Sequence, residues 1–384
     1  MATVLTSLAP TLFTAAQEVS AEPFGVIDAV TKNFDNKGVA FGDKILVPVV
    51  PVQAIESFTP ANIAASGAGA GTAEAVEVEI TKQQKVSMVL NGEQIRSLEN
   101  GGNYQEWVRQ WAAQSMRTLR NAAEADAALA IQGGASRAYG TAGTTPFATS
   151  LQDLTGVRKI LRDNGAPMSD LQLVVDSNAE LNLLNLGIIQ QAYAAGSDAE
   201  RRQGRIARQF GFAIGQSAGL AAFTKGTATA FDLDALPAAG YSIGDYKLNV
   251  DGGDGGTLKA GDILTLAGDT NKYVSNVAIA ALANDFVVTI GRPGLRMAHL
   301  NGVEFTIGGN YNPNLAFERS AVVAVMRPPL MPSNATIRSM AISDNMGMSY
   351  MFAEIDQYGQ RTWEILLSWG FKVVQPEHVA ILLG

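Results

Sequence analysis

The segment GQSAG at residues 215–219 comes nearest in this chain to the residue types and spacing of a catalytic site. It fits the G-x-S-x-G pattern, in which a sharp turn between a strand and a helix exposes a nucleophilic serine. That arrangement needs a helix directly after Ser217. Only a few residues separate Ser217 from the turn signal Lys225-Gly226, and no HGGG-type segment supplies an oxyanion hole. We interpret the segment as a glycine-punctuated strand or turn, and keep a serine hydrolase using Ser217 as the enzyme hypothesis.

The remaining candidates for acid–base or metal chemistry are isolated. The two histidines, His299 and His378, lie far apart in the sequence, and neither has a companion at metal-ligand spacing. We expect each to be a surface or hydrogen-bonding side chain. The paired acids Asp232 and Asp234 precede Pro237 and are expected in a loop.

The segment DGGDGG at residues 251–256 superficially resembles a calcium-binding loop. An EF-hand loop has oxygen ligands at regular positions and a bidentate glutamate at the twelfth. Counted from Asp251, the twelfth position is Asp262, and the intervening TLKAG carries no carboxylate. The sequence favours a hairpin turn here.

One basic cluster occurs, formed by Arg201, Arg202, Arg205 and Arg208. It has no interleaved aromatic residues, and two acids precede it, so we expect a solvated or intersubunit salt-bridging loop. The net charge of -8 and the pI near 5.0 argue against a dedicated nucleic-acid binder, which usually has a concentrated basic face. No phosphate-binding P-loop motif occurs, and the absence of cysteine excludes disulfides and thiolate metal sites. The sequence therefore assigns no catalytic, cofactor-binding or metal-ligating residue and no cofactor.

Composition favours a protein whose surface is covered by neighbours. Charged residues make up only 17% of the chain, against about 25% in average globular proteins. No stretch approaches the roughly 20 apolar residues of a membrane span. The first residues, MATVLTSLAPTLFTAAQEV, have no Lys or Arg before their apolar run, so we expect no secretory signal. The protein is expected to stay in the cytoplasm until it assembles.

Residues 1–100 predict an arm and a hairpin. Residues 1–40 suggest a short amphipathic helix and an arm that orders against a partner. The stretch KILVPVVPVQA at 44–54 is β-branched but contains two prolines, which favour an edge strand or one that stands away from the body. Residues 75–90 alternate as a second strand, and the Ala/Gly-rich segment 61–75 forms the tip between the two. A two-stranded hairpin is marginal in water, so we expect it to lie on another subunit.

Residues 103–132 predict the strongest helix, about 45 Å long, which Gly133-Gly134 ends. An α/β pattern follows. It has helices capped by Ser150 with Asp153 and by Ser177 with Glu180, and a buried strand at 171–175.

From about residue 224 to 312, Gly, Asp, Thr and Val dominate, and short strands bounded by turn signals predict a small all-β barrel or sandwich. Apolar strands resume at 314–326. Residues 349–384 then form two strands joined by the turn Tyr358-Gly359, followed by Pro-Glu-His and a short apolar strand.

These parts, in this order, resemble the major capsid proteins of tailed bacteriophages, the Hong Kong phage type of fold, which encapsulins share. The stretch GRIARQFGFAIGQS at 204–217 is similar to the glycine-punctuated segment of that family, and NLAF at 314–317 and the segment 369–377 also match in character. The β-rich insertion is most similar to that of the coat proteins of Salmonella short-tailed phages. The resemblance spans nearly the whole chain.

The resemblance implies an α+β capsid fold with six segments. They are an N-terminal arm (1–40), an extended hairpin loop (41–91), a spine helix with the peripheral domain (92–150), an axial domain (151–223), an inserted β domain (224–313) and a return to the axial and peripheral domains (314–384).

The implied function is that of a non-catalytic major capsid protein in the virion, assembled in the host cytoplasm. Copies would form hexamers and pentamers of an icosahedral shell that encloses double-stranded DNA without sequence-specific binding. Scaffolding and portal proteins would be partners, with a decoration protein as a further candidate, and no membrane is involved. Some members crosslink a hairpin lysine to a neighbouring subunit. The tip here has no lysine, and Lys82 and Lys85 lie down the stem, so we expect noncovalent closure.

Three alternatives stay open at this point. The first is an encapsulin-like cellular compartment, which shares the fold. The second is a β-rich phage tail or adhesive protein in which residues 224–313 are the functional module. The third is the Ser217 hydrolase.

Overall fold

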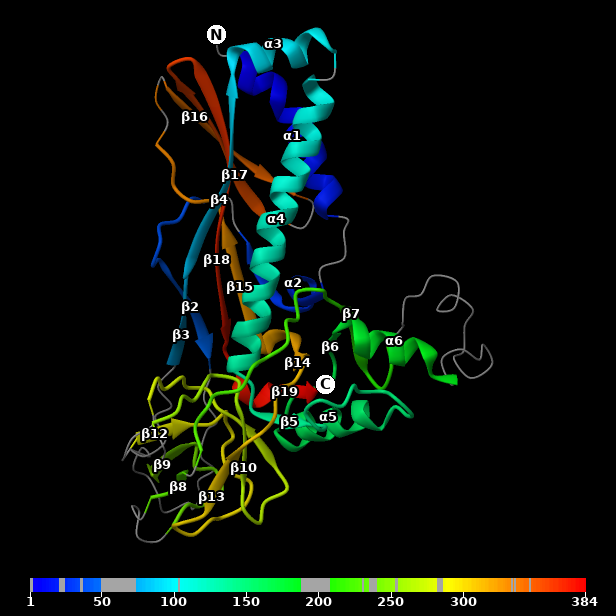
Figure 1. Cartoon of the computed structure of the whole chain (residues 1–384), viewed down its shortest axis with the longest axis vertical. Helices are drawn as coiled ribbons and strands as arrows, with labels where there is room; N and C mark the ends of the chain where they lie inside the picture. Colours follow the sequence, from blue (N-terminus) through cyan, green and yellow to red (C-terminus); the bar gives the residue numbers. More distant parts are fainter. Residues whose placement is uncertain are drawn as a thin grey trace, which may run out of the picture.

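The computed structural model describes residues 3–20, 25–34, 37–49, 74–102, 104–187, 208–229, 231–234, 240–252, 255–281, 286–332, 334, 336–344 and 347–384. The chain is a mixed α+β protein with a long upper arm of helices and strands above a base of two lobes (Figure 1). The basic cluster at Arg201, Arg202 and Arg205, the hairpin tip and Pro237 lie outside the described residues.

Helix α4 (Tyr104–Gly133) is the axis of the upper arm. Its buried residues recur at three- and four-residue steps, among them Val108, Ala112, Met116, Leu119 and Ala123, so one face is apolar along the whole helix. Thirty residues give a rod of about 45 Å. The predicted helix is confirmed to within one residue at each end.

A six-stranded sheet lies against α4, with the order β1-β15-β18-β17-β16 and with β4 also paired to β18. Its strands are β1 (Thr31–Phe34), β4 (Lys82–Asn91), β15 (Val322–Arg327), β16 (Ile337–Ser343), β17 (Ser349–Gln357) and β18 (Gln360–Val373). Strands β17 and β15 follow one another along one edge of β18, and β4 pairs along the other. The predicted C-terminal strand pair is therefore confirmed, and β18 is the central strand of this sheet. We call α4 together with this sheet the spine.

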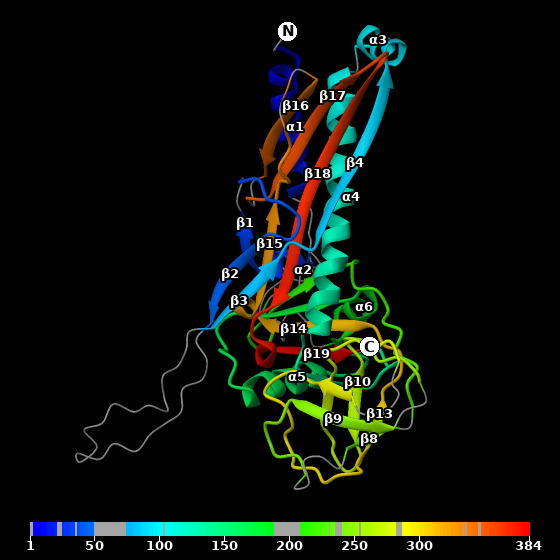
Figure 2. The same ribbon diagram turned by 90° about the vertical axis from the view of Figure 1, so that its left-hand side faces the viewer.

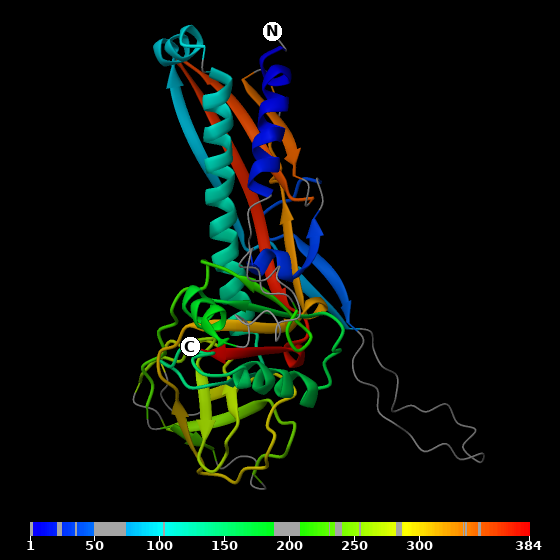
Figure 3. The ribbon, with the colours of Figure 1, turned by 90° about the vertical axis from the view of Figure 1, so that its right-hand side faces the viewer.

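The N-terminal residues belong to the spine of the same chain. Helix α1 (Thr3–Ser20) runs beside α4 (Figure 3) and buries Leu12 and Val19 in the shared core. Helix α2 (Gly25–Ala29) and β1 follow, and β1 pairs in parallel with β15. The expectation that this arm orders only against a partner is wrong, because its apolar face finds a partner surface on α4.

The hairpin differs from its prediction. Strand β2 (Lys44–Val49) pairs with β3 (Glu74–Glu79) in a separate two-stranded sheet, whereas β4 leaves the hairpin and pairs with β18 over ten residues. Residues 75–90 are thus two strands with different partners, and not one. The chain passes from β3 to β4 beside Gly370, where an added Cβ would lie 2.0 Å from the carbonyl oxygen of Glu79. Only glycine fits at this crossing.

The base contains an eleven-stranded sheet with the order β12-β9-β8-β13-β10-β11-β5-β19-β14-β6-β7. One half, the α/β unit, carries β5 (Arg137–Tyr139), β6 (Leu171–Val175), β7 (Phe212–Gln216), β14 (Pro313–Glu318) and β19 (Val379–Leu383), with α5 (Gln152–Asp163) and α6 (Ser177–Asn185). The other half, the β-rich unit, carries β8 (Phe231–Leu233), β9 (Lys247–Gly252), β10 (Ile263–Leu266), β11 (Lys272–Val274), β12 (Phe286–Thr289) and β13 (Glu304–Ile307). Each unit has its own core cluster of buried side chains.

The β-rich unit consists of short strands, as the sequence predicts for this region. A bridge between Ser275 and Ile290 brings the end of β11 back to the end of β12, so the six strands curl round one core. The unit is also joined to the α/β unit, because β11 pairs antiparallel with β5. One sheet therefore runs through both lobes.

Local helix caps differ from the predicted ones by a residue or more. Helix α6 is capped by Asp176, whose carboxylate accepts the Ala179 N–H, and not by Ser177. Helix α5 has no side-chain cap. Asp153 accepts the Phe147 N–H instead, and so orders the preceding loop. Asp232, expected in a loop, lies in β8.

Candidate functional site

The β2–β3 hairpin forms a two-stranded sheet of its own beside the spine sheet (Figure 2). Its inner face is anchored, because Val78 and Ile80 are buried in a small cluster with Val323 and Val325 of β15. Its outer face has no such cover, and Leu46 is 62% exposed. The run KILVPV, which contains Pro48, is thus a half-exposed apolar strand of a two-stranded sheet. Such a strand is a surface on which another chain can pack.

Two more apolar side chains lie at the base of this hairpin. Phe41 is 66% exposed and Leu330 is 67% exposed. The Leu330 N–H donates to the Val39 carbonyl at 3.0 Å, which places these two segments side by side. We call Phe41, Leu46 and Leu330 the hairpin surface.

A second exposed apolar area lies on the β-rich unit. Backbone hydrogen bonds in both directions join Tyr241 and His299, at 2.8 and 2.9 Å. This register places Ile243 opposite Met297, and they are 67% and 40% exposed. Leu300, beside His299, is 75% exposed.

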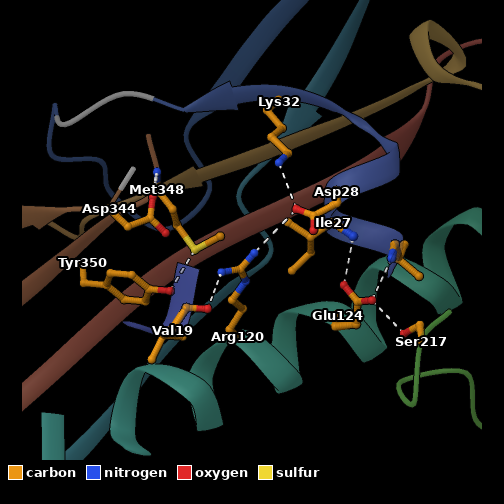
Figure 4. Close-up of polar contacts among 11 residues, drawn as sticks. Val19, Ile27, Asp28, Lys32, Arg120, Glu124, Ser217, Asp344, Met348 and Tyr350 are labelled. Atoms are coloured by element: carbon orange, nitrogen blue, oxygen red, sulfur yellow. Dashed lines mark hydrogen bonds and ion pairs between the residues drawn. The ribbon is translucent and has the colours of Figure 1, made fainter. Parts of the chain in front are cut away.

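A buried polar cluster joins the N-terminal segment to the spine and to the α/β unit (Figure 4). The carboxylate of Glu124 on α4 accepts the N–H groups of Val26 and Ile27 at 2.7 and 2.9 Å and the Ser217 hydroxyl at 2.7 Å. Burial raises the pKa of Glu124, and these three hydrogen bonds oppose the rise. A single side chain thereby holds α2, α4 and the segment after β7.

Arg120, one turn before Glu124, extends this cluster toward α1. Its guanidinium is fully buried, donates to the Val19 carbonyl at 3.2 Å and lies 3.6 Å from the Asp28 carboxylate. Nearby, the Tyr350 hydroxyl donates to the sulfur of Met348. The arrangement fixes the end of α1 against the spine.

The catalytic motif considered in the sequence has a structural role. Ser217 is buried, and its hydroxyl donates a hydrogen bond to Glu124. The described residues 217–229 that follow contain turns and extended chain but no helix. The strand–turn–helix context of a nucleophile elbow is therefore contradicted at this serine.

The two described acids of the segment that resembles a calcium loop, Asp251 and Asp262, accept hydrogen bonds from backbone N–H groups, and Asp254 lies outside the described residues. The buried carboxylate of Asp262 accepts the N–H groups of Gly226 and Lys259, and burial raises its pKa. Asp251 accepts the N–H of its neighbour Gly252. Among the described residues, no group of three or more His, Cys, Asp or Glu side chains could hold a metal ion.

The two histidines have separate surroundings. His299 is buried in the β-rich unit, with Nε2 3.4 Å from the Asp269 carboxylate. His378 lies in the 3-10 turn Pro376–His378 before β19, where the sequence places a turn. His299 is thus the hydrogen-bonding side chain that was expected.

The cations named in the sequence form ion pairs. Arg208 lies 3.1 Å from Asp170. On the hairpin stem, Lys82 lies 2.7 Å from Asp126 and Lys85 lies 2.6 Å from Glu364.

Sequence patterns alone did not identify the hairpin surface or the Glu124 cluster. Leu46 belongs to a continuous apolar run, which is equally typical of a buried strand, and Phe41 and Leu330 are single apolar residues in loops. Glu124 was one acid in a long helix, and its partners lie 93 to 98 residues away in the chain. No local signal marks either feature.

No protein-family model matches the chain, and none of the curated proteins compared matches it significantly. None of the described helices is long and apolar enough to span a membrane. Among solved structures, the chain is similar to one described as Mycobacterium phage Che8, with 14% identity, a TM-score of 0.46, and 89% of this chain and 84% of that chain covered. It is similar to the capsid structure of the cyanophage P-SCSP1u, with 12% identity, a TM-score of 0.46, and 92% and 86% covered. It is also similar to a virus-like particle from Pyrococcus furiosus, with 9% identity, a TM-score of 0.44, and 97% and 98% covered.

Proposed function

We propose that this chain is the major coat protein of a tailed phage, and that many copies assemble through their hairpins into a closed shell. The observation that carries the proposal is the β2–β3 hairpin. It is a two-stranded sheet of its own, anchored on β15 by its inner face, with the exposed apolar residue Leu46 on its outer face. Exposed apolar strand surfaces are sites on which other chains pack, so a neighbouring copy is the natural surface to cover it.

The rest of the architecture supports the same function. The spine gives each subunit a rigid long axis, and the Glu124 cluster fixes the N-terminal segment to it. The polar residues that the sequence suggested for chemistry instead form buried hydrogen bonds and ion pairs. This pattern favours a non-catalytic, shape-holding subunit.

In this proposal four parts of the structure have distinct roles. The β2–β3 hairpin is the extended loop, the spine belongs to the peripheral domain, the lobe with α5 and α6 is the axial domain, and the β-rich unit is the inserted domain. Copies form hexamers and pentamers in the virion, with scaffolding and portal proteins as partners during assembly in the host cytoplasm. Double-stranded DNA is the cargo, and the relation to the coat proteins of Salmonella short-tailed phages rests on the β-rich insertion.

The test is assembly of the purified full chain and of two variants at one position. We expect negative-stain electron microscopy to find closed particles for the wild type. Leu46→Glu should melt at the wild-type temperature and yield no particles, because a charge on the hairpin surface opposes its burial between copies. Leu46→Met, which conserves apolar character, should assemble.

Fibres or trimers in place of closed particles would contradict the shell and favour a tail or adhesive protein. If Leu46→Glu forms closed particles in wild-type yield, the hairpin surface is not part of the contact between copies. Double-stranded DNA in particles from the native source separates a phage coat from an encapsulin-like compartment.

A further inference from the structure

A cleft of about 530 Å³ lies where the α/β unit meets the β-rich unit. Its walls come from β5 and the loop that follows it, from α5, and from the turn that leads into β11. Three cationic side chains from three different elements line it, namely Arg137 on β5, Lys159 on α5 and Lys272 on β11. We call it the cationic cleft.

Arg137 is an unusual residue in this position because it is only 4% exposed. Its Nη1 and Nη2 donate to the side-chain oxygens of Asn271 and Asn164 at 3.1 and 2.8 Å, both neutral acceptors. Its buried Nε has no hydrogen-bond partner. Within the described part of the chain, no carboxylate lies within ion-pair distance of Arg137. A buried charge without a counter-ion is costly, and such groups gather at binding sites.

The two lysines add to this uncompensated charge. Lys272 donates to the Gly140 carbonyl, which is neutral, and burial lowers its pKa. Lys159 is exposed at the rim and forms no ion pair with the described residues. Burial, together with the charge of Arg296, also lowers the pKa of Arg137, and the more distant charges of Asp163 and Asp269 oppose this shift only in part. All three groups would gain from a bound anion.

Two acids share the cleft and do not cancel its charge. Asp153 is engaged with the Phe147 N–H at 2.8 Å, and Asp163 lies exposed on the rim. Three cations against two carboxylates leave a net positive lining.

One wall of the cleft is aromatic. The ring of Tyr139 packs directly on Gly156 of α5, where an added Cβ would lie 2.3 Å from the ring. Gly156 thus leaves room for the ring beside the helix, and Tyr139 gives the cleft lining an aromatic side chain. Threonines 141, 144 and 145 supply hydroxyl groups along the same rim.

We propose that the cationic cleft binds a small phosphorylated ligand of about mononucleotide size. A tetrahedral phosphate has three oxygens that can accept from donors on three sides, whereas a planar carboxylate matches one or two. The volume lies in the range of small-molecule sites and is larger than a bare phosphate needs, and Tyr139 offers a surface for a base. A nucleic-acid duplex, about 20 Å across, is too large to enter. The proposal is independent of shell assembly.

The experiment is calorimetric titration of the full chain with adenosine 5′-monophosphate, inorganic phosphate and adenosine at low and high salt. We expect adenosine 5′-monophosphate to bind more tightly than phosphate and adenosine to show no binding. The affinity should fall at high salt, since the contacts are charged. Lys159→Gln and Lys272→Gln should each weaken binding about tenfold. Lys247→Gln, the same charge change at an exposed residue at the start of β9, should have no effect.

Several outcomes would overturn the proposal. These are no binding of adenosine 5′-monophosphate at millimolar concentration, equal binding of adenosine, and wild-type affinity in both cleft variants. The variants must melt at the wild-type temperature. Lys159→Gln, an exposed substitution, keeps the test valid if Lys272→Gln does not fold. Two further results would reject the small ligand in favour of a macromolecular partner. One is binding of a short DNA duplex that adenosine 5′-monophosphate does not displace, and the other is binding of a glutamate-rich peptide in place of the nucleotide.

Discussion

At the residue scale, buried carboxylates hold this molecule together by accepting hydrogen bonds from several donors at once. Asp269 is an example in the β-rich unit. Its side chain is 2% exposed and accepts from the Tyr273 hydroxyl at 2.6 Å and from the Asn271 backbone and side chain at 2.8 and 2.7 Å. Burial alone would raise the pKa of Asp269, but these bonds and His299 hold it below its usual value of 3.8.

We therefore predict that Asp269→Asn destabilises the chain by about 2 kcal/mol at neutral pH. The NH2 group of asparagine would replace a carboxylate oxygen and would face hydrogen-bond donors that it cannot accept from. A depressed pKa contributes stability that is present above the unfolded-state pKa and is lost as pH falls through the folded-state pKa. The difference between wild type and variant should thus shrink in acid, below about pH 4. Chemical denaturation at a series of pH values measures it.

The matched control is Asp251→Asn, an exposed acid at the end of β9 that accepts only from its neighbour. It should leave the denaturation midpoint unchanged. A pH-independent loss in Asp269→Asn would mean that packing, and not the carboxylate, stabilises this turn.

At the element scale, the placement of α2 depends on one side chain of α4. We predict that Glu124→Gln costs about 2 kcal/mol, because its NH2 group must face at least one of the donors of Val26, Ile27 and Ser217. The loss should appear in the free energy of unfolding and as faster hydrogen exchange at Val26 and Ile27. Glu93→Gln on the exposed helix α3 (Gly92–Asn100) is the control and should change neither. Unchanged exchange at these two amides would contradict the anchoring role.

The elements themselves followed from the sequence wherever one periodic pattern covered them. Helix α4 and the pair β17–β18 were predicted because their apolar spacing and turn residues are local. The split between β3 and β4 was not predicted, because Ile80-Thr81 continues the same alternation of apolar and polar residues. The two strands are distinguished only by the pairing of β4 with β18, which is distant in the sequence. The predicted helix cap was wrong by one residue where two residues that can both cap a helix are neighbours, as Asp176 and Ser177 are.

The candidate site was less predictable than the fold for a physical reason. Exposure of Leu46 depends on whether another layer packs on the outer face of the hairpin, which alternation within the strand does not encode. The cationic cleft unites Arg137, Lys159 and Lys272, and their spacing in the sequence carries no motif. Both features arise from tertiary pairing.

At the scale of the whole molecule, the β-rich unit is part of the structural frame. Its two connections to the parent lie together, since Phe223 and Tyr311 exchange hydrogen bonds at 2.8 and 3.3 Å. A short Gly-Ser linker could therefore join these two residues and delete the unit. We predict that the deleted chain is insoluble or misassembled, because β5 loses β11 and becomes an open strand edge.

Solubility and electron microscopy measure this outcome. The control is the same linker inserted at the exposed turn Tyr358-Gly359, which should leave the chain soluble. Fully stable, normally closed particles from the deletion would mean that the β-rich unit is an independent appendage.

The central position of β18 also has a consequence for how the chain is made. Its neighbours β4, β15 and β17 come from both halves of the sequence, and β19 likewise completes the sheet of the base. Neither sheet can close until residues 360–383 have left the ribosome. Until then, the apolar face of α4 and the strand β4 wait without their main partner, so the nascent chain is exposed to aggregation for most of its synthesis. The time taken to synthesise the residues between β4 and the end of β18 thus sets how long each new subunit is exposed in this way.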